Sequence, residues 1–392
     1  MPVNFQEIQR QVKEMGRQAP QREKILRDKR EQAERLLQDC SDRLEELGRR
    51  VEQAVSYNSG LRCAVPVEEN LTYSCLPQPI QGSVVLLAAD GSQVNPSRHD
   101  PVEFGVINIG AIRIIPGQAE PPREITRTQL LYQDALYSNE GPLTEEIVAL
   151  RRDLNERKML AELAAREELP VVALTDGPME LFREPKENKE FRQPFQEYLQ
   201  ALRKLAELNV SAGGYVDKPR ADLAVRLLEL AVLAEGDLSQ AGKLRPLEGV
   251  KDEDLFCQLL KPGERSAVFA IQSTSSRDFT GSLALHFFYL NVGRQDHPYV
   301  ARVEVPKWVI QKQDLLNLIH ATLVSQCLQM GSRPYPYALH RAHEVAVVSF
   351  AEKAELQEMI AVELLRQGVE AGQKSNKQVH KDQSGTRTRY KG

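Results

Sequence analysis

Apolar residues along the chain fall into two patterns, which together predict alternating strands and helices. Short apolar or alternating runs are typical of strands, and apolar residues spaced three and four apart are typical of helices. The predicted strands are 83–90, 104–115 (one or two strands), 170–175, 210–217, 266–272, 283–292 and 299–305, and the predicted helices are 144–168, 190–208, 221–234, 311–329 and 338–366. Because the runs at 83–90 and 170–175 are apolar throughout, we expect strands buried on both faces of a mixed α/β sheet.

The first 56 residues differ from the rest of the chain because they are rich in Gln, Glu, Arg and Lys. Glu23 and Arg30 interrupt a weak heptad pattern in this segment. Its apolar positions are Leu37, Leu44 and Val51 at a, and Leu26, Ala33, Cys40, Leu47 and Ala54 at d. The segment is therefore either an amphipathic helix on its own domain or a long helical arm that forms a coiled coil or binds a partner.

The same patterns predict four regions. Residues 1–56 form the helical arm, 57–82 a linker, 83–366 a large α/β domain and 367–392 a basic tail. From residue 372 onward the tail carries six Lys or Arg residues against one Asp and lacks apolar periodicity. We therefore expect the tail to be disordered.

Composition narrows the class of protein. The 392 residues are 41% hydrophobic and 27% charged, which excludes a wholly disordered or fibrous chain. The chain has 51 Lys and Arg residues against 55 Asp and Glu residues, which gives a formal net charge of -4. This charge excludes a nucleic-acid-binding protein that is basic overall, but a local basic groove remains compatible with it. No apolar run approaches the roughly 18–20 residues that span a bilayer. The five cysteines are scattered without a CxxC pair, so we expect a cytoplasmic protein without disulfides, a zinc ribbon or membrane contact.

Two aspartates follow the two buried runs, and a glycine follows each of them. Asp90 ends the run SVVLLAAD and Asp176 follows PVVALT. Open α/β folds place their sites at the carboxyl ends of such strands. Two carboxylates brought together there repel each other unless a cation lies between them, and Mg²⁺ or Mn²⁺ suits oxygen ligands. The alternative is that each Asp-Gly pair merely closes a strand with a turn.

An ordered set of motifs resembles the NurA nucleases, which process DNA ends. The motifs are VVLLAADGS, VVALTDGPM, GGYVDKPR at 213–220, LLKPGERSAVF at 259–269, ARVEVPKW at 301–308 and RPYPYALHRAHEVAVVS at 333–349. The resemblance covers roughly residues 83–355. It implies a ribonuclease-H-like mixed sheet flanked by helices, with a carboxylate cluster that binds Mn²⁺, or Mg²⁺ in its place.

Carried over by motif, the resemblance implies five catalytic residues: Asp90, Glu162, Asp176, Tyr335 and His343. Of these, Asp90, Glu162, Asp176 and His343 are the implied metal ligands. The glutamate is ambiguous, because Glu162 fits best on the helix before the second aspartate but Glu156 is the second choice. Glu162 could also be a solvated helix residue beside Arg166.

Tyr335 and His343 are also interpretable from the local sequence. Pro334 and Pro336 keep the chain extended, so we expect a helix from about residue 338 with His343 in its second turn. A neutral imidazole there could ligate a metal or orient water, and the alternative is a buried core histidine. The Tyr335 hydroxyl could hold a phosphate oxygen, and His99 is a weaker candidate for supporting Asp90.

The activity that the resemblance implies is a 5'–3' exonuclease and single-strand endonuclease in DNA end resection and double-strand break repair. The implied partners are DNA, a HerA-type hexameric ATPase and a second copy of the chain. The chain has no GxxxxGK[ST] motif, so any motor is a separate protein. Candidate residues for tracking the DNA backbone are Arg113, Arg123, Arg127, Lys218, Arg220, Arg265 and Arg341. The alternatives are a catalytically silent adaptor that docks a motor and a ribonuclease-H-like enzyme acting on RNA.

Overall fold

A computed structural model of the 392-residue chain describes residues 4–138, 141–181, 189–369 and 372. The chain forms two units, and each unit combines segments that are far apart in the sequence. Unit 1 comprises residues 1–80, 177–181 and 213–335, and unit 2 comprises residues 81–176, 182–212 and 336–392.

Unit 2 contains a mixed sheet with the strand order β8-β3-β4-β5. The strands are β3 (Val85–Val94), β4 (Gly105–Ile114), β5 (Arg123–Leu131) and β8 (Val171–Asp176). β3, β4 and β5 form an antiparallel meander, and β8 pairs with β3 in parallel. The first residues of β3 and nearly all of β8 are buried, as the continuous apolar runs predict. A small hairpin pairs β6 (Tyr137–Ser138) with β7 (Gly141–Pro142).

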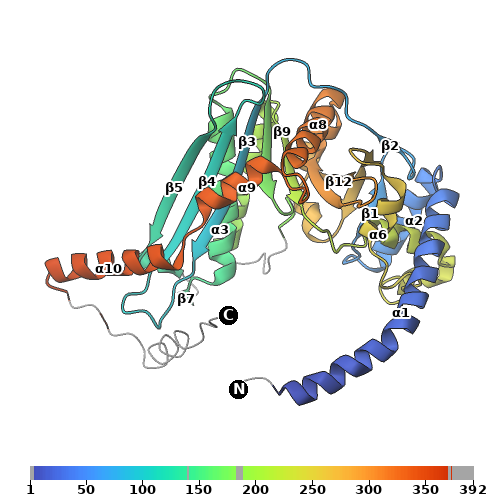
Figure 1. The fold of residues 1–392 in the computed structure, drawn as a ribbon, viewed down its shortest axis with the longest axis horizontal. Helices are drawn as coiled ribbons and strands as arrows, with labels where there is room; N and C mark the ends of the chain where they lie inside the picture. The colour runs from blue at the N-terminus through green and yellow to red at the C-terminus, as the bar shows by residue number, and fades with distance from the viewer. Residues whose placement is uncertain (1–3, 139–140, 182–188, 370–371, 373–392) are drawn as a thin grey trace. The chain divides into compact units, whose positions relative to one another are not determined.

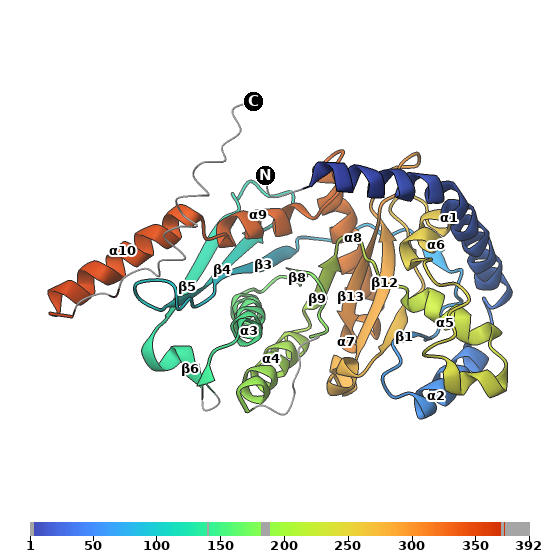
Figure 2. The same cartoon turned by 90° about the horizontal axis from the view of Figure 1, so that it is seen from below.

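Helices cover both faces of this sheet. The helices of unit 2 are α3 (Glu145–Ala164), α4 (Lys189–Glu207), α9 (Tyr337–Ala346) and α10 (Phe350–Arg366). α3 packs against β3, β4 and α4, and α9 packs against β3, β4 and β5. Gly91 contacts α3, whereas Gly110, which pairs with Asp90, contacts α9. Successive residues of a strand point to opposite faces, so Gly91 and the pair of Asp90 and Gly110 face opposite sides. The two helices therefore cover opposite faces of the sheet. Figure 2 shows α3 and α9 on the two sides of the sheet.

Unit 1 is built on an antiparallel sheet with the order β1-β11-β12-β13-β9. Its strands are β1 (Cys63–Pro66), β2 (Ser74–Cys75), most of β9 (Ser211–Val216), β10 (Arg265–Ser266), β11 (Phe269–Gln272), β12 (Leu285–Asn291) and β13 (Val300–Pro306). Its helices are α1 (Phe5–Asp39), α2 (Leu44–Tyr57), α5 (Leu223–Val232), α6 (Asp252–Leu259), α7 (Lys307–Ile310) and α8 (Gln313–Gln329). The rings of Phe256, Phe269, Phe287 and Tyr289 pack on one another in its core, in stacked and edge-on pairs.

The N-terminal segment is a long helix followed by a shorter one (Figure 1). The Asn4 side chain caps α1 by accepting a hydrogen bond from the Glu7 backbone N–H at 3.2 Å. Ala33, Leu37 and Cys40 are buried, so the C-terminal part of α1 packs on unit 1, where it contacts α5 and α6. The predicted long N-terminal helix is thus confirmed, although the segment forms two helices instead of one.

Several elements differ from the predicted ones. β3 does not end at Asp90, because four further residues continue its antiparallel pairing with β4. The helix predicted over 338–366 breaks at Ser349, whose side chain accepts from the Glu352 N–H and forms a capping box that starts α10. β5 was not predicted, because most of its residues are polar and exposed.

These elements confirm the predicted fold class, a mixed α/β sheet flanked by helices with a long N-terminal helix. Within the described ranges, no helix combines the length and the apolar character that a bilayer crossing requires. The tail from residue 373 onward lies outside the described residues.

Candidate active site

Asp90 lies where β3 loses its parallel partner and keeps its antiparallel one. The register with β8 ends at Ala89 opposite Thr175, and the register with β4 places Asp90 opposite Gly110. Asp90 Oδ1 accepts a hydrogen bond from the Gly91 backbone N–H at 2.8 Å. The carboxylate is 17% exposed, so it is held by the backbone and still reachable from solvent.

His343 contacts Asp90 directly. It lies in the second turn of α9, as predicted, and its Nδ1 is 2.7 Å from Asp90 Oδ2. A carboxylate oxygen accepts hydrogen bonds, so Nδ1 carries the hydrogen of this contact. The side chain is 63% exposed, so His343 is a surface residue and the core-histidine interpretation is wrong.

Asp176 lies level with Asp90 on the neighbouring parallel strand. Ala89 pairs with Thr175, and Asp90 and Asp176 are the next residues of the two strands. The two aspartates are therefore at the same level along the parallel pair. Residues level with each other on paired strands point to the same face of a sheet. Asp90, Asp176 and His343 therefore share the face of unit 2 that α9 covers.

Glu156 approaches β3 from the opposite face, on α3. Its side chain is 7% exposed, and a Cβ at position 91 would lie only 2.8 Å from Glu156 Oε1, so the glutamate packs directly against Gly91. Burial raises its pKa well above the ordinary value, and the charges of Asp153 and Asp90 raise it further. The positive charges of Arg157 and Arg152 lower the pKa of Glu156. Glu156 therefore interacts with a cluster of charged residues that includes Asp90.

Glu162 is placed differently. Its carboxylate accepts two hydrogen bonds from Arg127 of β5, at 2.6 and 3.2 Å, and is 46% exposed. The hydrogen bond from Arg127 lowers the pKa of Glu162, as expected for a surface ion pair. Glu156 thus packs against β3 close to Asp90, whereas Glu162 pairs with an edge strand, and which of the two glutamates takes part in the reaction stays a prediction.

The two other candidates, Tyr335 and His99, have contacts of a different kind. Tyr335 is the last residue of unit 1, and its ring packs edge-on against Tyr215 with centroids 5.6 Å apart. His99 lies in the turn after β3, where its backbone N–H donates to Ser97 Oγ at 3.3 Å. Neither position tests the role predicted for the side chain.

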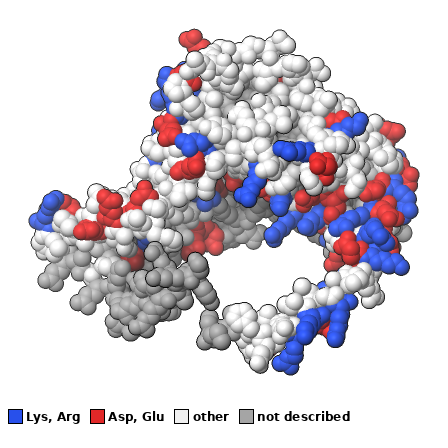
Figure 3. Space-filling model, in the orientation of Figure 1, with Lys and Arg blue, Asp and Glu red and all other residues white. Residues whose placement is uncertain are grey.

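Most of the arginines proposed to track DNA are paired with carboxylates. Figure 3 shows Lys and Arg side chains interspersed with Asp and Glu over the visible face. Arg265 is 1% exposed and bonds to Glu69, so it is a core residue. The other pairs are Arg113 with Glu167 and Glu120, Arg123 with Glu120, Arg127 with Glu162, and Arg341 with Glu124 and Glu344. A phosphate backbone would have to compete with these carboxylates.

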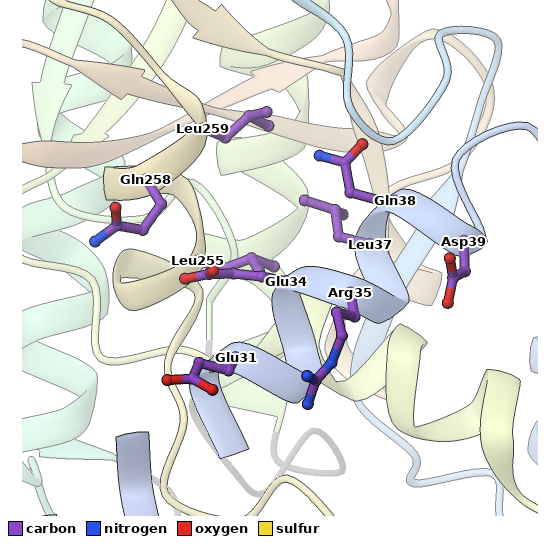
Figure 4. A pocket seen from close by; sticks show the side chains of 9 residues that line it. All are labelled: Glu31, Glu34, Arg35, Leu37, Gln38, Asp39, Leu255, Gln258 and Leu259. Carbon is purple, nitrogen blue, oxygen red and sulfur yellow. The ribbon is translucent and has the colours of Figure 1, made fainter. Parts of the chain in front are cut away.

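A groove of 640 Å³ lies in unit 1 between α1 and α6 (Figure 4). Leu37, Leu255 and Leu259 form its apolar part. Its polar lining has three acidic residues against one basic residue and consists of Glu31, Glu34, Arg35, Gln38, Asp39 and Gln258. This charge disfavours a phosphate backbone, so the groove is not a candidate for binding DNA.

The comparison with family models identifies the chain. The model of the NurA domain matches residues 84–348, which include both aspartates and His343. The chain belongs to the NurA domain family. No curated protein matches the sequence.

Several solved structures resemble this NurA-domain chain at low identity. The NurA nuclease of Sulfolobus solfataricus is 12% identical, with 84% of this chain and 95% of that chain covered and a TM-score of 0.46. The catalytic domain of human endonuclease V is 14% identical, with 81% and 98% covered and a TM-score of 0.32. LC9-RNase H1 is 18% identical, with 32% and 60% covered and a TM-score of 0.20.

Sequence reasoning missed several residues that build this part of the NurA domain. Arg152 lies one turn before Glu156, 3.7 Å from its Oε1, and is paired with Asp153 at 2.9 Å. Asn108 is a buried polar residue within the apolar run FGVINIGAIRII. A polar residue in such a run was a usable signal, because a buried amide needs hydrogen-bond partners.

Proposed function

We propose that this NurA-domain protein is a divalent-metal-dependent DNA nuclease. The finer activity proposed is 5'–3' exonuclease and single-strand endonuclease cleavage during end resection and double-strand break repair in the cytoplasm. The proposed catalytic residues are Asp90, Asp176, Tyr335 and His343, with either Glu162 or Glu156 as the glutamate of α3. The observation that carries the proposal is the Asp90–His343 contact of 2.7 Å inside the segment that matches the family.

The donor types fit Mn²⁺ or Mg²⁺. Carboxylate oxygens are ligands that both ions accept, and imidazole suits Mn²⁺. Asp90 and Asp176 follow neighbouring parallel strands at the same level, so their like charges would favour a cation between them. No three His, Cys, Asp or Glu side chains among the described residues are grouped closely enough to enclose an ion. The carboxylates proposed as ligands are those of Asp90 and Asp176, which share the face that α9 covers.

The chain's own groups then have defined roles in phosphodiester hydrolysis. A divalent ion, when bound, would acidify water and stabilise charge on the phosphate. The carboxylate of Asp90 orients the imidazole of His343 through Nδ1–H. The His343 side chain is 63% exposed, and its imidazole is the group proposed to accept a proton from water or to give one to the leaving oxygen.

The decisive experiment is a cleavage assay on end-labelled linear duplex and single-stranded DNA with Mn²⁺, Mg²⁺ or EDTA. We expect cleavage with Mn²⁺, none with EDTA, and none by Asp90→Asn. Asp237→Asn serves as the matched control, because this exposed aspartate lies in unit 1. Metal-independent cleavage, or full activity of Asp90→Asn, would refute the assignment.

The same assay distinguishes the alternative functions. A wild-type protein that cleaves neither DNA nor RNA but binds a motor ATPase is an adaptor. Cleavage of RNA or RNA–DNA hybrids in preference to DNA identifies an enzyme that acts on RNA.

We further propose that the protein acts as a homodimer with a HerA-type hexameric ATPase. The support is the family resemblance and the solvent-exposed apolar side chains of α1, which are Phe5, Ile8, Val12 and Met15. Sedimentation of the full chain and of a variant lacking residues 5–25, with and without such an ATPase, tests this. A truncated variant that keeps both associations would assign α1 no role in assembly.

A further inference from the structure

Three polar side chains form one row across the sheet of unit 2, on the face that α9 covers. Ser92 of β3 lies opposite Asn108 of β4, which lies opposite Thr128 of β5. Paired residues share a face, and Ser92 is two residues from Asp90, so the row lies on the same face as Asp90. Thr128 Oγ1 donates to Asn108 Oδ1 at 2.6 Å. This bond leaves the amide nitrogen of Asn108 pointing away from Thr128.

The row ends on the last carbonyl group of α9. Asn108 Nδ2 and Ser92 Oγ both donate to the carbonyl oxygen of Ala346, at 2.8 and 2.5 Å. The last carbonyls of a helix lack partners within the helix, so two side-chain donors satisfy this one fully. Asn108 and Ala346 are 8% and 1% exposed, so water competes little for these bonds.

Gly110 allows α9 to come this close to β4. A Cβ at position 110 would lie 2.5 Å from Ala346 N, 2.7 Å from Ala342 O and 2.8 Å from Val345 C. These atoms are all backbone, so a side chain at position 110 could be accommodated only by moving the helix. The glycine and the polar row together set the height and the rotation of α9 above the sheet.

The position of α9 in turn determines where the imidazole lies. His343 precedes Ala346 by three residues, or about 4.5 Å along the helix. Asp90 precedes Ser92 by two residues, or about 6.6 Å along the strand. Because His343 is 63% exposed, few neighbouring side chains restrain it, and its contact with Asp90 depends on how the helix is held.

We propose that Asn108, supported by Ser92, is a positioning residue that holds α9 so that His343 Nδ1 meets Asp90. The inference rests on the proposed function only in assigning His343 to the reaction. Neither Asn108 nor Ser92 touches the reacting groups; both act through the Ala346 carbonyl.

The test compares Asn108→Ala, Ser92→Ala and the double variant with wild type. The first readout is the ¹⁵N and ¹H signal of the His343 imidazole in the metal-free protein, assigned with His343→Gln. We expect wild type to show one tautomer with hydrogen on Nδ1, and the double variant to show a mixture of tautomers. The second readout is the single-turnover cleavage rate at saturating DNA, which should fall about tenfold in Asn108→Ala and about a hundredfold in the double variant, with DNA affinity unchanged.

Asn291→Ala is the matched control, because this buried asparagine of unit 1 also donates to a backbone carbonyl, that of Leu260 at 2.8 Å. It should lose thermal stability yet keep the wild-type imidazole signal and rate. An unchanged imidazole signal in the double variant would overturn the proposal, as would an equal loss of rate in Asn291→Ala. If Asn108→Ala does not fold, Ser92→Ala alone decides, because it removes a single oxygen atom. A wild-type protein without nuclease activity would refute the proposed function, and the imidazole signal would still decide this inference.

Discussion

Replacing Gly110 with alanine tests how tightly α9 is packed on the sheet. The added Cβ would lie 2.5 Å from Ala346 N, about 1 Å short of ordinary contact between non-bonded atoms. Because the opposing atoms belong to the helix backbone, no side chain can rotate away and α9 has to withdraw. Overpacking of this kind costs about 1–3 kcal/mol.

That cost corresponds to a fall of about 3–10 °C in the melting temperature of a unit of this size. Withdrawal of α9 also moves His343 away from Asp90, so the cleavage rate should fall while DNA affinity is kept. Thermal unfolding followed by circular dichroism, and single-turnover cleavage, measure the two effects.

Gly48→Ala is the matched control, because Gly48 lies inside α2 and an added Cβ would meet nothing within 4 Å. Alanine is the better helix former by about 1 kcal/mol, so this control should raise the melting temperature. A Gly110→Ala protein with wild-type stability and wild-type rate would show that the sheet and α9 are not packed as described.

Three further outcomes are expected. Glu156→Gln should lower the cleavage rate on the order of a hundredfold, because it alters the buried cluster beside Asp90. Glu162→Gln should lose only a surface ion pair, so its rate in the same assay should stay near that of wild type. Burial holds the pKa of His320 at about 4, below its ordinary 6.5. Between these two pH values the unfolded chain binds a proton that the folded protein does not. The free energy of unfolding should therefore fall by up to about 3 kcal/mol as the pH drops from about 6.5 to about 4. Urea titrations across this range should show a weaker dependence in His320→Gln. Deleting residues 372–392 removes six basic residues, so the dependence of DNA affinity on salt, measured by fluorescence anisotropy, should flatten while the cleavage rate stays unchanged.

The buried strands and the positions of Asp90 and Asp176 could be predicted because burial on both faces leaves a continuous apolar run in the sequence. The end of β3 could not be predicted, because Gly91 and Ser92 read as a turn. They remain in the strand because β4 supplies antiparallel partners as far as Val94. A distant pairing partner outweighs a local turn preference.

Which of the two candidate glutamates of α3 is buried was also beyond the sequence. Glu156 and Glu162 lie on one helix, and the spacing of apolar residues does not say which is buried. Glu156 is buried because glycine at position 91 leaves room for its carboxylate against β3, and Arg152 and Arg157 provide charge nearby. Glu162 pairs instead with Arg127, from a strand whose polar sequence gave no strand signal.

The outer strand of unit 2 has a consequence for how the protein behaves at high concentration. β5 ends the order β8-β3-β4-β5, and a nine-residue edge of this kind can recruit a strand from another molecule and seed aggregates. Its charged residues oppose this, because Arg127 is fixed by Glu162 and Glu124 by Arg341. An incoming strand would have to displace or bury these ion pairs. The salt bridges along β5 therefore contribute little to folding but protect the solubility of the folded protein.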